Sequence, residues 1–148
     1  MTFETFQQHV VQAQAKRSWQ FEGQRDAPLS VDRVRDIERE HGVELPDGYR
    51  RFLSVYGAGD FAFTAIYSPD HNSGWSLWRN LDRFLGGRRD FLPFADNGCG
   101  DYYGFPVVTG HCEDRVVWAD HEQDYSVSEC EYEGFLDYML KEGLRVEV

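Results

Sequence analysis

Apolar residues recur at helical spacing between residues 30 and 57 and predict two short helices joined by a bend. The second helix starts near Pro46 or Asp47 and ends at Gly57. Its apolar face consists of four large side chains at intervals of three and four residues: Tyr49, Phe52, Leu53 and Tyr56. We expect this face to be buried.

The first helix of the pair carries its own start and stop signals. Ser30 is a suitable N-cap, because its hydroxyl can accept hydrogen bonds from the free amides of the first turn. Leu29 and Val34 occupy the positions of a hydrophobic staple around that cap. Gly42 is placed to end the helix in the left-handed conformation. These signals bound the helix on both sides.

Three more helices follow from apolar spacing. An N-terminal helix is predicted over residues 2–17, with one face formed by Phe3, Phe6, Val10 and Ala13. A short helix is predicted from Trp75 to Leu85. The last helix is predicted to open with a capping box of Ser128 and Glu131. Its expected buried face consists of Tyr132, Phe135, Leu136, Met139 and Leu140.

Strands are predicted between these helices. Alternating aromatic and β-branched residues indicate a strand over residues 61–67. Strands over residues 91–95 and 101–108 flank a turn over residues 96–100, and another strand is predicted over residues 115–119. The fold class is therefore α+β, as a single domain with an antiparallel or mixed sheet of about four to six strands and helices packed against it.

Neighbouring residues of a strand face opposite ways, which separates the aromatic residues of the sheet into two groups. We expect Trp118 and one of Tyr102 and Tyr103 to be buried. The other tyrosine is the better candidate for a position that faces a partner, and we assign this role to Tyr103, because aromatic side chains anchor interfaces.

Length and composition agree with one globular domain. The chain has 148 residues, of which 41% are hydrophobic. No apolar run approaches the ~20 residues of a membrane helix, and the N-terminus lacks the features of a secretion signal. We therefore expect a cytoplasmic protein without a membrane partner. Three widely separated cysteines, Cys99, Cys112 and Cys130, are interpreted as reduced thiols.

The net charge of -11 disfavours nucleic-acid binding, since such a surface repels phosphates. The acidity is uneven: residues 111–148 hold 11 acidic and 3 basic residues. This asymmetry has two interpretations, a solvated face that gives solubility or a patch that meets a basic partner. Charge alone does not separate them.

The residues that suggest catalysis or metal binding have simpler interpretations. A calcium loop starting at Asp96 fails, because Val107 stands where the closing glutamate is needed. A metal site from His111, Cys112 and residues 120–122 is disfavoured, because adjacent strand residues diverge. Cys99 has no histidine at a recognisable spacing for a nucleophile. We expect no catalytic residues, no metal and no cofactor.

Residues 30 to 140 resemble the SUKH superfamily, which includes fungal Smi/Knr cell-wall regulators. The resemblance rests on the segment Gly42 to Leu53 with the Tyr56–Gly59 turn after it, on Leu92 to Tyr103, and on Val116 to Glu122. It implies one α+β domain. It also implies an immunity protein, since many bacterial members bind and silence a toxin.

We therefore expect a non-enzymatic binding protein whose acidic face occludes the basic cleft of a toxin, such as a nuclease. The predicted partner-binding residues are Glu113, Asp114, Asp120, Glu122, Asp124, Glu129, Glu133 and Tyr103. The alternative is a regulatory scaffold like the fungal relatives, and a small hydrolase is a third hypothesis. The sequence names neither the toxin nor the oligomeric state, and it places the acidic residues together only along the chain.

Overall fold

The computed structural model describes residues 1–147. Its α-helices are α1 (Phe3–Lys16), α2 (Val31–His41), α3 (Asp47–Val55), α4 (Leu77–Phe84) and α5 (Phe135–Tyr138). A π-helical turn, η3 (Met139–Gly143), continues α5, and the 3₁₀ turns are η1 (Ser18–Phe21) and η2 (His121–Gln123). The strands are β1 (Gly59–Phe61), β2 (Thr64–Ile66), β3 (Phe91–Asp96), β4 (Tyr102–Val108), β5 (His111–Cys112), β6 (Val117–Asp120) and β7 (Ser126–Glu129).

The main sheet is antiparallel and has the order β3-β4-β6-β7, with β5 paired to the end of β4. Tyr103 lies opposite Trp118 in β6, and Trp118 lies opposite Ser128 in β7. Strand β7 forms one edge of this sheet, and all four of its residues are exposed. Strands β1 and β2 form a separate antiparallel hairpin. The predicted α+β class with an antiparallel sheet is confirmed.

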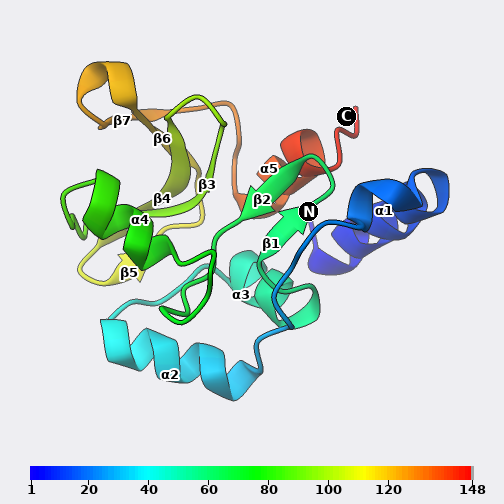
Figure 1. Ribbon diagram of the computed structural model, residues 1–148, viewed down its shortest axis with the longest axis horizontal. Helices are drawn as coiled ribbons and strands as arrows, with labels where there is room; N and C mark the ends of the chain where they lie inside the picture. The colour runs from blue at the N-terminus through cyan, green and yellow to red at the C-terminus, as the bar shows by residue number, and fades with distance from the viewer. Residues whose placement is uncertain (148) are drawn as a thin grey trace.

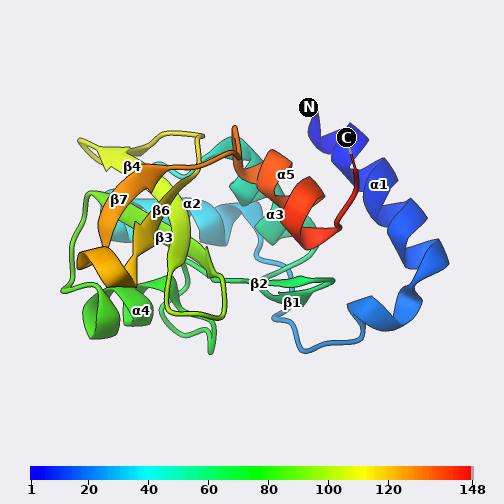
Figure 2. The same ribbon diagram turned by 90° about the horizontal axis from the view of Figure 1, so that it is seen from above.

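The elements lie along one long axis (Figure 1). The main sheet occupies one end and α1 the other, with α3, α5 and the β1–β2 hairpin between them in both views (Figure 2). On one side of the sheet, Tyr102 reaches α4, where its hydroxyl lies 3.2 Å from Oδ1 of Asn80. On the other side, Tyr103 packs against Tyr138 of α5 with ring centroids 5.1 Å apart. The sheet is therefore covered on both faces near these tyrosines.

An aromatic core joins α3, α5 and the first two strands of the main sheet. The ring of Phe94 lies 4.9 Å from that of Phe105 and 5.1 Å from that of Phe135. Tyr49 is fully buried and donates its hydroxyl hydrogen to the carbonyl of Tyr67 at 2.6 Å. Because each buried aromatic side chain removes a large apolar area from water, this cluster stabilises the contact between helices and sheet.

The start and stop signals of α2 act as predicted. The hydroxyl of Ser30 accepts a hydrogen bond from the amide of Arg33 at 3.0 Å. Gly42 adopts the left-handed conformation with φ 63°, a region that a glycine enters without steric cost. Helix α3 buries Tyr49, Phe52 and Leu53, as their spacing predicts.

Two elements differ from prediction. The single strand expected over residues 61–67 covers the last residue of β1, the turn and all of β2, because the chain reverses near Ala62, which has φ 51°. The capping box of Ser128 and Glu131 does not form, because Ser128 pairs with β6. Helix α5 begins at Phe135 instead, and its first amide donates to Oδ1 of Asp114 at 3.2 Å.

The aromatic residues of the sheet are distributed partly as expected. Tyr102 is buried and Tyr103 is half-buried. The prediction that Trp118 is buried is wrong, since this side chain is only half-buried on the same face as Tyr103. The reason is that β6 lies next to the edge strand β7, whose four residues are all exposed and give it little cover.

Candidate functional site

A cleft of about 460 Å³ lies where the β1–β2 hairpin, the β3–β4 turn and the end of the chain's last helix meet. Three carboxylates line it, from Asp60, Asp96 and Glu142. Tyr103, the aromatic residue predicted to face a partner, also lines this cleft. The cleft thus combines negative charge with an aromatic side chain.

Each carboxylate of the cleft is held by a hydrogen bond from a neighbouring group. Asp60 accepts from the amide of Gln24 at 3.2 Å. Asp96 accepts from the hydroxyl of Tyr67 and from the amide of Gly98 at 2.7 Å. Glu142 accepts from the hydroxyl of Tyr132. These bonds fix the position of the charges and leave further oxygen lone pairs for a partner.

The two tyrosines that hold carboxylates remain proton donors. Burial is the largest cause that raises the pKa of Tyr67, and its hydrogen bond to Asp96 raises this pKa further. Burial and then the hydrogen bond to Glu142 raise the pKa of Tyr132 in the same way. Both hydroxyls therefore keep their hydrogen and donate it to the carboxylates that line the cleft.

Among the described residues that line the cleft, Arg145 is the one cation. Its guanidinium lies over the ring of Phe63, 4.2 Å from the ring centroid. This cation–π contact keeps the arginine at the rim of the hairpin. One positive charge against three carboxylates leaves the cleft with a net negative charge.

A second group of acidic residues lies at the same end of the sheet. Tyr102 is opposite Asp96 in β3 and opposite Ala119 in β6, so the end of β6 lies near the β3–β4 turn. The last residue of β6 and the turn after it supply three of the predicted partner-binding residues: Asp120, Glu122 and Asp124. We call the set Asp60, Asp96, Asp120, Glu122, Asp124 and Glu142 the acidic edge.

The turn after β6 is anchored to the β3–β4 turn through one buried carboxylate. Oδ1 of Asp101 accepts from the amide of His121 at 2.9 Å and lies 2.6 Å from Nδ1 of the same histidine. Its other oxygen accepts from the side-chain amide of Asn97 at 2.8 Å. Asp120 itself accepts from the amide of Glu122 at 2.9 Å and so caps η2. The turn that carries Asp120 and Glu122 is therefore held against the β3–β4 turn.

The remaining predicted acidic residues lie at the opposite end of the β6–β7 pair, since Glu129 is opposite Val117 while Ser126 is opposite Asp120. This group consists of Glu113, Asp114, Glu129 and Glu133. Arg115 neutralises part of it, with ion pairs of 2.8 Å to Glu113 and 3.2 Å to Glu129. The predicted set thus divides into two groups that the length of β6 separates.

Sequence reasoning missed the carboxylates of the cleft itself. Asp60, Asp96 and Glu142 lie in three segments that only the tertiary fold brings together. In the sequence, Asp96 belongs to a predicted turn and to a calcium loop that fails. No local pattern connects it with the other two residues.

The residues that the sequence suggested as possible metal ligands do not come together at one site. His111 is exposed, and its Nδ1 lies 3.4 Å from Oε2 of Glu44. Cys112 is buried, and burial raises its pKa to about 12. His121 faces Asp101 at the other end of the sheet. These three side chains therefore belong to separate environments.

Comparison with known proteins gives one family. A model of the family SUKH_6, described as SMI1-KNR4 cell-wall, matches residues 32–139. No curated protein matches the chain. No solved structure matches it either. Over residues 1–147, none of the helices has the length and apolar character that crossing a membrane requires.

Proposed function

Because this chain belongs to the SUKH_6 family (SMI1-KNR4 cell-wall), we propose that it is an immunity protein, which neutralises a protein toxin by binding it. The acidic edge is the proposed binding surface. It would occupy a basic groove of the toxin and keep the substrate of the toxin out. Inhibition of this kind is stoichiometric and requires no catalytic group.

The observation that carries this proposal is the acidic cleft with Tyr103 on its wall. Asp96 and Glu142 are positioned by tyrosine hydroxyls before any partner arrives, so little ordering is needed on binding. A lysine or arginine of the partner could reach these carboxylates in the cleft. Tyr103 offers the kind of half-buried aromatic side chain that anchors interfaces.

The exposed part of the acidic edge has a different role in the proposal. Glu122 and Asp124 are exposed on the turn after β6 and act at longer range. Charges of this kind mainly raise the association rate with a basic partner, and salt weakens their effect. The group around Arg115 contributes less, because ion pairs within the chain already satisfy part of its charge.

The family description also supports a second role, as a regulatory protein that recruits a cellular partner, like the cell-wall regulators after which the family is named. Such a protein would use the same surface without silencing a toxin. The position of the gene separates the two roles, since an immunity protein is encoded next to its toxin.

The test measures the binding of this protein to the toxin domain encoded beside it, and the protection of cells that produce both. The edge variant combines Glu122→Gln, Asp124→Asn and Glu142→Gln. The control variant combines Glu113→Gln, Glu129→Gln and Glu133→Gln, which removes the same charge at the other end of β6. We expect the edge variant to bind at least about tenfold more weakly at low salt, and the control to change binding by less than about threefold.

Two outcomes would overturn parts of this proposal. A larger loss in the control variant would reject the acidic edge as the binding surface. Continued killing by the toxin in the presence of abundant folded wild-type protein would reject the immunity function. Circular dichroism of both variants shows that the differences arise from the surface and not from unfolding.

A further inference from the structure

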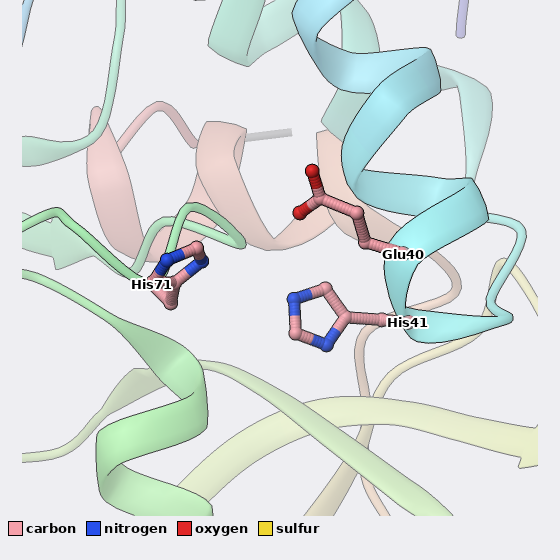
Figure 3. Close-up of side chains that lie close together, drawn as sticks. All are labelled: Glu40, His41 and His71. Carbon is pink, nitrogen blue, oxygen red and sulfur yellow. The ribbon is translucent and has the colours of Figure 1, made fainter.

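Two histidines and a glutamate face a common space between the end of α2 and the loop before α4 (Figure 3). Glu40 and His41 belong to α2, and His71 belongs to the loop. One ligating atom of each residue lies within 4.8 Å of those of the other two. Consecutive helix residues are about 100° apart around the helix axis, so Glu40 and His41 can both reach toward the loop.

The imidazole of His41 is held in place by an aromatic stack. Its ring lies 3.9 Å from the ring of Trp78, with an angle of 14° between the planes. The indole of Trp78 is fixed in turn, because its nitrogen donates to the carbonyl of Pro69 at 2.6 Å. The orientation of the His41 ring is therefore determined by α4 and by the loop that carries His71.

The His41 nitrogen that faces the other two residues lacks a partner. Nε2 of His41 is buried and has no hydrogen bond within the described part of the chain. Figure 3 shows this nitrogen, remote from the point where the ring is attached, directed toward His71 and Glu40. A buried nitrogen without a partner is unfavourable unless something else binds it.

Arg33 joins the two elements that carry these residues. Its guanidinium forms ion pairs of 3.2 Å with Glu40 on α2 and of 3.2 Å with Asp70 in the loop. The loop is therefore tied to the helix next to His71. Arg89 lies over the ring of Trp78 at 5.4 Å from its centroid. Asp70 offsets part of the positive charge that Arg33 brings next to Glu40.

We propose that Glu40, His41 and His71 bind a divalent transition-metal ion, and that Zn²⁺ is a fitting one. Two imidazole nitrogens and one carboxylate oxygen are ligands that Zn²⁺ takes, and three protein ligands leave a fourth position open. Ligand atoms around Zn²⁺ lie about 2.0–2.2 Å from the ion, so the three side chains must move closer together. Glu40 and His71 are exposed and can do this without disturbing the core.

This site was not predicted, because Glu40 and His41 are separated from His71 by a helix, the β1–β2 hairpin and two loops. Within residues 1–147, a second group of metal-ligating side chains, Asp101, Asp120 and His121, is a weaker candidate. It holds a single imidazole, and Nδ1 of that ring already lies 2.6 Å from Asp101. It therefore serves as a control.

The test uses the full chain, freed of metal by a chelator and titrated with ZnCl₂ by isothermal calorimetry. We expect one Zn²⁺ per chain. His71→Ala leaves the core untouched, and His41→Phe keeps the stack on Trp78 while removing the nitrogen. Each should weaken Zn²⁺ binding by at least about tenfold, whereas His111→Gln and His121→Gln should leave it within about twofold.

A second measurement does not depend on calorimetry. Zn²⁺ should raise the melting temperature of the wild-type protein and leave that of His71→Ala unchanged, since a ligand that binds only the folded state stabilises it. Absence of stoichiometric binding at micromolar Zn²⁺ would overturn the proposal. Binding that survives in His71→Ala, or that is lost in His121→Gln, would overturn it as well.

Discussion

Asp101 and His121 form a charged pair that ties the turn after β6 to the β3–β4 turn, with Nδ1 of the histidine 2.6 Å from Oδ1 of the aspartate. The hydrogen bond to Asp101 raises the pKa of His121 above its ordinary value. Burial alone would raise the pKa of Asp101, but hydrogen bonds from His121 and Asn97 outweigh it and leave this pKa below its ordinary value. The stabilisation that this pair gives to the folded protein is therefore confined to a range of pH between the two shifted pKa values.

The first prediction concerns stability against pH. A histidine whose pKa is raised by folding stabilises the protein below its ordinary pKa and loses this effect as the pH rises through the raised value. The aspartate contribution is lost as the pH falls through its lowered pKa. We expect Asp101→Asn to destabilise the protein more at pH 5.5 than at pH 8.5, as measured by urea unfolding.

NMR titration of the five histidines provides the check on this prediction. The pKa of His121 should lie above the ordinary value of a histidine and should fall in Asp101→Asn. A His121 pKa at the ordinary value in the wild-type protein would show that the pair does not form in solution.

The second prediction concerns Gly104 in the centre of β4. A Cβ atom at this position would lie 2.4 Å from the carbonyl oxygen of Leu92 and 2.7 Å from two atoms of the Phe91 ring. Because the nearest atom belongs to the backbone, the strand itself would have to shift. We expect Gly104→Ala to lower the free energy of unfolding by about 1–3 kcal/mol.

Gly74 is the matched control for this substitution. No atom lies within 4 Å of a Cβ built there, and its backbone is outside the left-handed region. We expect Gly74→Ala to change the free energy of unfolding by less than about 0.5 kcal/mol in the same denaturant experiment. Equal effects of the two substitutions would mean that β3 and β4 are not packed as described.

The third prediction concerns the hydroxyl of Tyr49. It is buried and donates to the carbonyl of Tyr67 at 2.6 Å, which ties α3 to the segment after β2. Tyr49→Phe keeps the ring and leaves that carbonyl without this donor. We expect a loss of about 1–2 kcal/mol in the free energy of unfolding. The half-buried Tyr125 is the control, and Tyr125→Phe should have a smaller effect.

The fourth prediction concerns thiol reactivity. Cys99 is exposed, whereas Cys112 is buried and its pKa is raised by burial to about 12. Since the thiolate is the reactive form, Cys99 should react first with a thiol reagent in the folded protein. Cys99→Ser should remove the fast phase at pH 8. A fast phase that persists in this variant would have to come from Cys112 or from the half-buried Cys130, and would contradict the prediction that Cys99 reacts first.

The parts of the fold that local signals determine could be predicted. Ser30 and Gly42 bound α2 because capping depends on neighbouring backbone groups. The β1–β2 hairpin was missed because it requires a positive φ at Ala62, a conformation that alanine rarely adopts. The capping box at Ser128 failed for a different reason, since pairing with β6 overrides a local helix signal.

The candidate sites also differ in whether their residues are close in sequence or are brought together only by the tertiary fold. Residues 120 to 124 could be identified because they are close in sequence and acidic. The cleft of Asp60, Asp96 and Glu142 could not, since its parts come from three segments. The space between His41 and His71 was missed because it depends on how the loop after β2 folds against α2.

Strand β7 has a consequence for behaviour at high protein concentration. An edge strand can template the addition of a strand from another molecule and so begin aggregation. This one has only four residues and ends at Glu129, so a second copy would gain few main-chain bonds and would bring like charges together. The shortness of β7 thus limits the addition of further molecules at this edge of the sheet.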